Sequence, residues 1–116
     1  MKTTELTGLA LDWAVATAEG YSEWDGECFT SYADGYPGAF YLSDWKPSSK
    51  WQDGGAIIER ERISIAWNMT HWVAWTGVIE HKGTTPLEAA MRCYVSGELG
   101  SEVDIPDELM ETAGGY

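Results

Sequence analysis

Tryptophan is unusually abundant in this chain, with seven in 116 residues, and most of them fall outside the segments that look helical. The positions are Trp13, Trp24, Trp45, Trp51, Trp67, Trp72 and Trp75. Helical cores are usually filled by aliphatic side chains, because a buried indole needs an acceptor for its N–H group. Tryptophan in strands and loops therefore indicates either a small core enlarged by large rings or a flat apolar surface for a ligand or a protein.

The length fits one domain, residues 1–116, with a single core. No apolar run approaches the roughly 18 residues that would span a bilayer, and the first residues lack the apolar segment of a secretory signal. We therefore expect a cytoplasmic protein. In a reducing compartment, Cys28 and Cys93 are better explained as free thiols than as a disulfide.

The net charge of −12 is unevenly distributed along the chain. Residues 3–45 hold eight acidic side chains and no lysine or arginine, and residues 93–116 hold six acidic ones and again no basic one. The stretch 46–92 carries six basic against five acidic side chains, a net of +1. A surface with this much negative charge repels a phosphate backbone, and we therefore expect no binding to a nucleic acid polymer. The central stretch could still bind a small anion.

Two helices have clear sequence signatures. Thr7–Glu19 has a threonine cap, whose hydroxyl should accept a backbone N–H, and Gly20 as its stop. Thr85-Pro-Leu-Glu combines a cap, a proline at the first helical position and a capping-box glutamate, and Gly100 ends that helix. Leu11 and Val15 form a second apolar edge on the first helix, which predicts that it is covered on two sides, by a loop or by another subunit. A last short helix follows Pro106, and residues 112–116 should fray.

The remaining segments predict a small antiparallel sheet. Arg62–Trp67 alternates with a period of two, and Ile57 and Ile58 look like the opening of the same strand. Trp72–Ile79 is the expected partner strand. Residues 21–44 are predicted to form an aromatic-rich irregular insertion with one short strand near Ala39–Ser43, and 43–55 a polar loop. The expected fold class is α+β, with a small antiparallel sheet packed on two main helices.

Catalytic motifs are missing from the sequence. It has no nucleophile elbow, no P-loop and no dinucleotide fingerprint, and His71 and His81 lack a further metal ligand. We therefore predict no cofactor, no metal and no enzyme activity. Glu59 and Glu61, two apart on the expected strand, leave open an acid–base role in a hydrolase, although a solvent-facing charged strand explains them as well.

The candidate ligand-binding residues are two tryptophans and four cations: Trp45, Lys46, Lys50, Trp51, Arg60 and Arg62. Indole faces stack on nucleotide bases, and arginine binds phosphate with two parallel hydrogen bonds. The alternative is that the four cations only pair with neighbouring carboxylates. A pocket formed by this set would suit a nucleotide-like anion.

Four ordered blocks resemble the phage NinX-like family, a family of tailed phages and prophages whose function is unknown. They are Glu-Leu-Thr-Gly-Leu-Ala-Leu-Asp-Trp-Ala-Val-Ala-Thr-Ala-Glu-Gly (5–20), Gly-Gly-Ala-Ile-Ile-Glu-Arg-Glu-Arg-Ile-Ser-Ile (54–65), Trp-Val-Ala (72–74) and Thr-Pro-Leu-Glu-Ala-Ala-Met-Arg-Cys-Tyr-Val (85–95). The resemblance implies a small accessory protein in an infected bacterium and transfers no catalytic residues. Such proteins often act against host defence.

Three functional hypotheses follow. The first is a non-enzymatic protein that binds and sequesters a small nucleotide-like anion, for which a homo-oligomer would help by building pockets between chains. The second is an acidic inhibitor that docks on a host enzyme or defence protein. The third, a hydrolase of a small nucleotide substrate, depends on Glu59 or Glu61. The composition of the tryptophan–cation segment favours the first.

Overall fold

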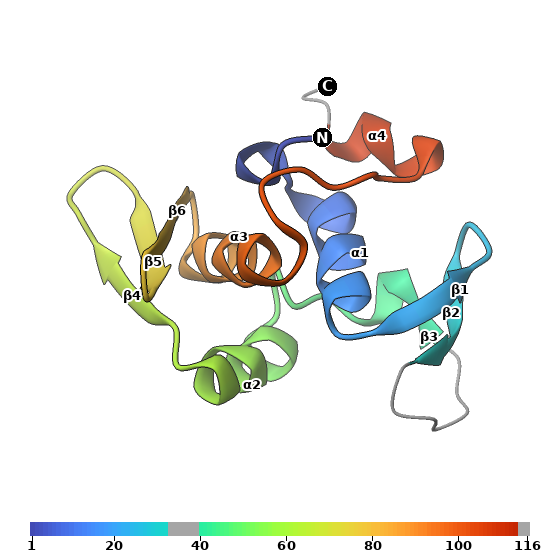
Figure 1. Cartoon of the computed structure of the whole chain (residues 1–116), viewed down its shortest axis with the longest axis horizontal. Helices are drawn as coiled ribbons and strands as arrows, with labels where there is room; N and C mark the ends of the chain where they lie inside the picture. Colours follow the sequence, from blue (N-terminus) through green and yellow to red (C-terminus); the bar gives the residue numbers. More distant parts are fainter. Residues whose placement is uncertain (33–39, 114–116) are drawn as a thin grey trace.

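The computed structural model describes residues 1–32 and 40–113 and contains helices arranged between two antiparallel sheets. The helices are α1 (Gly8–Ala18), α2 (Trp51–Glu61), α3 (Pro86–Leu99) and α4 (Asp107–Ala113), with single 3-10 turns at Thr3–Glu5 and Leu42–Asp44. The first sheet holds β1 (Tyr21–Trp24), β2 (Cys28–Tyr32) and β3 (Phe40–Tyr41), and the second holds β4 (Ser64–Trp67), β5 (Trp72–Thr76) and β6 (Ile79–Gly83). In Figure 1, α3 lies between the second sheet and α1. The α+β class is confirmed.

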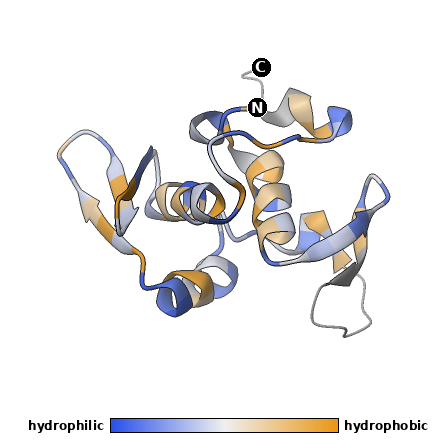
Figure 2. Ribbon diagram, in the orientation of Figure 1, coloured by the Kyte–Doolittle hydropathy of each residue, from blue (hydrophilic) through white to orange (hydrophobic). Residues whose placement is uncertain are grey.

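Helix α1 forms the centre of the molecule. It packs against α3 on one side and α4 on another, and it is apolar over most of its circumference (Figure 2). The predicted coverage on two sides is therefore correct, and it comes from the chain's own helices. Gly20 has the left-handed backbone (φ 100°) expected just beyond the helix end. Among the described residues, no helix is long and apolar enough to cross a membrane.

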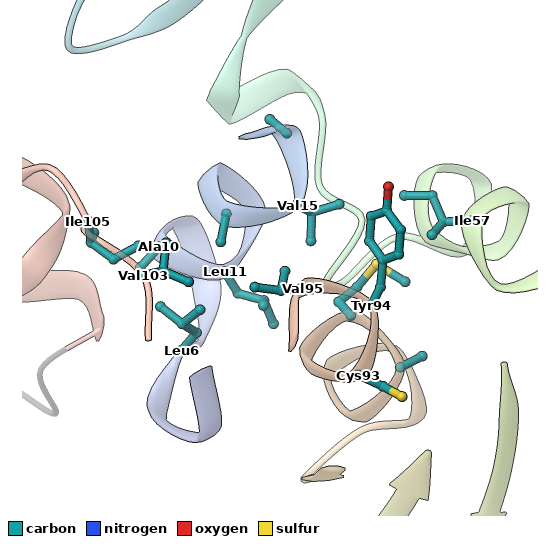
Figure 3. Packing of buried hydrophobic residues seen from close by; sticks show 14 of the residues in the cluster. Leu6, Ala10, Leu11, Val15, Ile57, Cys93, Tyr94, Val95, Val103 and Ile105 are labelled. Atoms are coloured by element: carbon teal, nitrogen blue, oxygen red, sulfur yellow. The ribbon is translucent and has the colours of Figure 1, made fainter. Parts of the chain in front are cut away.

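The core lies where α1, α2 and α3 meet (Figure 3). Leu11 and Val15 of α1 and Val95 of α3 are completely buried, and Ile57 of α2 joins them at 3% exposure. On the other side of α1, Val103 and Ile105 precede α4 and pack into the same cluster. Burial of each such side chain stabilises the fold by about 1.5–3 kcal/mol relative to leaving it exposed.

A second group of packed side chains is aromatic and lies against the first sheet. Phe29 on β2 is 1% exposed, and the rings of Trp24 and Phe40 lie 5.0 and 5.5 Å from it between centroids. Trp13 of α1 approaches it at 6.3 Å. The indole N–H of Trp24 donates to Glu108 of α4, which ties the sheet to that helix. Much of the unusual aromatic content therefore enlarges the core.

The prediction for residues 21–44 was wrong in its first half. Instead of an irregular segment, Tyr21–Trp24 and Cys28–Tyr32 form an antiparallel hairpin in which Trp24 pairs with Phe29. The strands are short, and their stability comes from ring packing that a local pattern does not reveal. The strand expected near Ala39–Ser43 is present as Phe40–Tyr41. The rest of the expected insertion, 33–39, lies outside the described residues, as do 114–116 of the tail expected to fray.

The predictions of a polar loop over 43–55 and of a strand opening at Ile57 and Ile58 were wrong from Trp51 onward. The polar loop ends at Lys50, and Trp51–Glu61 is a helix that includes Ile57 and Ile58. Two adjacent glycines, Gly54 and Gly55, disfavour a helix locally. In the folded protein, however, α2 packs so closely on its neighbours that only glycine fits at position 54. A Cβ at Gly54 would lie 2.3 Å from the carbonyl oxygen of Pro47 and 2.7 Å from Leu87.

The second sheet contains one strand more than predicted. The expected strand Trp72–Ile79 is interrupted by a turn at Gly77 and Val78, so that Ile79 begins β6. Strand β4 pairs with β5, placing Trp67 opposite Trp72. Trp72 and Trp75 are three apart on one strand and so lie on opposite faces.

Candidate functional site

A groove lies where the beginnings of α1 and α3 meet the segment before α2, and we call it the α1–α3 groove. One part is a pocket of about 350 Å³ lined by Thr7, Gly8, Leu9, Asp12, Lys46, Ser48, Ser49, Thr85 and Glu88. An adjoining pocket of about 310 Å³ shares Ser48, Ser49 and Thr85 and adds Trp51, Pro86 and Leu87. The groove therefore runs from a polar pocket to an exposed indole.

The Lys46–Ser49 segment forms one wall because carboxylates hold its backbone at both ends. The amide of Lys46 donates to Asp53 of α2 (2.9 Å), and the amide of Ser48 donates to Asp12 of α1 (2.9 Å). Pro47 between them is fully buried. The amides of Ser49 and Lys50 then donate to the carbonyl of Lys46, which closes a tight turn. The wall is thus fixed from two different helices.

Glu88 of α3 holds the opposite wall. Thr85 caps this helix as predicted, since its hydroxyl accepts from the amide of Glu88. The Glu88 carboxylate accepts from the amide of Thr84 (2.9 Å) and from the hydroxyl of Thr7 (2.7 Å). Burial pushes the pKa of Glu88 upward, but these hydrogen bonds and the charge of Arg92 prevail and lower it. Glu88 is therefore an ionised structural link between α1 and α3.

Thr7 was expected to cap α1 with its side chain, and this was wrong. Its hydroxyl donates to Glu88 and makes no capping hydrogen bond. The first backbone N–H groups of a helix have no partner inside it, and Gly8 and Leu9 line the pocket. The beginning of α1 therefore contributes positive electrostatic potential to the groove.

Asp12 is the most unusual group in the groove. It is only 2% exposed, although it lines the pocket. Burial raises the pKa of its carboxyl to about 6, against the lowering effects of Ser48 and Lys46. Buried acids with raised pKa values are concentrated at functional sites. The sequence does contain a signal for it, since Asp12 is the one charged residue within the segment Gly8–Ala18.

The groove contains two of the six predicted ligand-binding residues, Lys46 and Trp51. The Trp51 side chain is 57% exposed at the first turn of α2, and Lys46 makes no ion pair within the described ranges. Trp45 instead packs on Phe40, with ring centroids 5.5 Å apart. Lys50 is the exposed residue that precedes α2.

Arg60 and Arg62 lie at the other end of α2, about 14 and 17 Å along the helix from Trp51. Arg60 binds Glu19 through two hydrogen bonds (3.0 and 2.6 Å) and lies over the ring of Tyr94. Arg62 ends the helix in a left-handed conformation. Glu59 and Glu61 belong to this helix too, so the prediction that they share one strand face was wrong.

The Arg60–Glu19 pair has a structural role that can be tested. Although burial opposes it, hydrogen bonds from Arg60 and Tyr94 lower the pKa of Glu19 from 4.5. A carboxylate whose pKa is lower in the folded than in the unfolded state stabilises the protein at pH values above the unfolded-state pKa. This stabilisation is lost as the pH falls through the folded-state pKa. Glu19→Gln should therefore lower the free energy of unfolding by about 1 kcal/mol at neutral pH. The loss should shrink in acid.

Denaturant unfolding at neutral pH and at about pH 3 measures this difference. The exposed Glu5→Gln is the matched control and should change stability by less than about 0.5 kcal/mol. An equal loss for Glu19→Gln at both pH values would contradict the assignment.

The family model of bacteriophage P22 NinX matches residues 2–97 of this chain. The match spans most of the chain, so the protein belongs to this phage family, as its four sequence blocks suggested. It includes every residue that lines the α1–α3 groove, whereas α4 lies beyond it. No curated protein matches the chain.

Proposed function

We propose that this member of the P22 NinX family binds and sequesters a small nucleotide-like anionic ligand in the α1–α3 groove. The main support for this proposal is that one groove joins a polar pocket containing Lys46 to the exposed ring of Trp51. An indole face can stack on a base. Lys46 and the first amides of α1 can bind a phosphate. In an infected cell, a protein that acts in this way would deprive a host defence system of its signal.

The proposal differs from the sequence-based prediction in its location. Arg60 forms salt bridges with Glu19 and Glu61. Lys46 forms no salt bridge among the described residues, and it acts on Asp12 through its charge without such a contact. A cation in a salt bridge gains less from an incoming phosphate than one without, because its partner has to be displaced first. Lys46 is therefore the better candidate to bind the phosphate.

Calorimetric titration with 3′,5′-cyclic AMP and with ADP-ribose tests the proposal. We expect at least one probe to bind. Lys46→Gln and Trp51→Ala should each lower the affinity for that probe roughly tenfold, since one stacking or charged contact contributes about 1–3 kcal/mol. The matched controls are Arg60→Gln, a cation outside the groove, and Trp67→Ala, an indole 51% exposed on the second sheet. Both should retain wild-type affinity.

Two results would count against this function. If neither probe binds or raises the melting temperature, cyclic mononucleotides and ADP-ribose derivatives are excluded as ligands. If Arg60→Gln abolishes binding while Lys46→Gln does not, the site lies at the far end of α2.

The second candidate is an acidic inhibitor of a host protein, and it is supported by how the acidic flanks meet. Helix α4 packs against α1, and the hydrogen bond from Trp24 to Glu108 joins β1 to α4. Helix α4, which belongs to the second acidic stretch, therefore lies next to elements of the first. A basic partner should bind this part of the molecule with an affinity that falls steeply with salt. Capture that is unaffected by salt would contradict this alternative.

A further inference from the structure

Asp12 is placed where a charged carboxylate is costly. It lies in the middle of α1, and one of its oxygens accepts the amide of Ser48 at 2.9 Å. Only 2% of the residue is exposed, yet it lines a pocket large enough for several ligand atoms. Asp12 accepts from both the amide and the hydroxyl of Ser48. A residue needed only for these two hydrogen bonds could be neutral, because an asparagine oxygen has two lone pairs with which to accept them. The acid therefore calls for a further explanation.

The charges around Asp12 come from three other segments. Lys46 lies in the wall before α2, Asp53 belongs to α2, and Glu88 belongs to α3. Lys46 favours the ionised form of Asp12, whereas Asp53 disfavours it. With a pKa of about 6, roughly a tenth of the molecules carry a protonated Asp12 at about pH 7. An anion entering the pocket raises this fraction, because its negative charge repels the ionised carboxylate and so favours the protonated form.

We infer that Asp12 determines ligand specificity in the groove by binding in its protonated form, donating a hydrogen bond to an anionic oxygen of the ligand. The inference depends on the ligand-binding role proposed above. The proton comes from solvent and stays on the carboxyl group, and no covalent bond is made or broken. The ligand class is then an anion whose phosphate oxygens accept this hydrogen bond, and phosphodiesters and pyrophosphate diesters are members of it that do not titrate over this pH range.

The test is the pH dependence of the affinity for 3′,5′-cyclic AMP and ADP-ribose between about pH 5 and 8. Both probes lack a phosphate monoester, whose own second pKa near 6 would confuse the result. We expect the affinity to be level below about pH 6 and to fall by up to tenfold per pH unit above it. The binding heat should also vary with the ionisation enthalpy of the buffer, because a proton is taken up.

Asp12→Asn should abolish both the pH dependence and the buffer dependence, because the amide donates a hydrogen bond without titrating. Glu19→Gln, which removes a carboxylate outside the groove, should retain both. Affinity that is independent of pH in the wild type, or a slope that persists in Asp12→Asn, overturns the inference while leaving ligand binding intact. Affinity that rises with pH means that the ionised carboxylate binds a donor instead, which also overturns it. Absence of binding at every pH overturns the proposed function and the inference with it.

Discussion

Asp12→Asn should make the protein more stable at neutral pH, by about 1–3 kcal/mol. Burial raises the pKa of Asp12 from 3.8 to about 6, and a tenfold change in a proton-binding constant corresponds to about 1.4 kcal/mol. Because the folded pKa is raised, the contribution of Asp12 to stability is fully present below about pH 3.8 and is lost as the pH rises through 6. Asparagine keeps an oxygen that can accept from the amide and the hydroxyl of Ser48, and it avoids the cost of burying a charge.

Denaturant unfolding from about pH 4 to 8 measures this effect. The gain should be largest above pH 7 and should approach zero near pH 4, the opposite sign to the effect of Glu19→Gln. A variant that is less stable than the wild type by the same amount at every pH would show that asparagine cannot replace the acid structurally. A gain in stability would mean that the chain retains Asp12 at a cost, as expected for a functional group.

Gly54→Ala should lower the free energy of unfolding by at least about 2 kcal/mol, even though alanine is the better helix former. Its Cβ would meet the Pro47 carbonyl oxygen at 2.3 Å and Leu87 at 2.7 Å. The carbonyl belongs to the backbone and cannot rotate away, so α2 or the wall of the groove has to move. Displacement of Pro47 shifts Lys46 and Ser48 with it, so the affinity for any groove ligand should fall as well.

Gly55→Ala, the next residue of the same helix, is the matched control. Its Cβ would make an ordinary contact of 3.7 Å with Trp51, so the helix-propensity gain of about 0.5–1 kcal/mol should appear. Thermal or denaturant unfolding of the two variants compares them directly. Equal stabilities would mean that α2 does not pack this closely on Pro47.

The sequence predicted the elements whose signals are local. The cap and proline at Thr85-Pro86 fix the start of α3 through backbone chemistry within one turn. The alternation of Ile65 and Trp67 identified β4 for the same reason. The α2 helix was missed because its two glycines oppose it locally, and only the approach of Pro47 explains Gly54. The β1–β2 hairpin was missed because it is stabilised by contacts of its aromatic rings with residues that are distant in sequence.

The candidate site shows the same division. Composition alone selected Lys46 and Trp51 as candidates and also showed that the chain carries cations among aromatic rings. It could not distinguish them from Trp45 and Arg60, because that distinction depends on which side chains already have partners. Trp45 packs on Phe40, and Arg60 binds Glu19, 41 residues away in sequence.

Short-range patterns and composition were enough to establish the α+β class, the two main helices, the family and the strong acidity of the chain. The places of the seven tryptophans and the residues that form the groove follow only from how the folded chain packs. Packing around Phe29 gives Trp13 and Trp24 a structural role. Asp12, Lys46 and Thr85 come from three segments far apart in the chain. Their proximity results from the folding of α1 against α3, and no local pattern contains it.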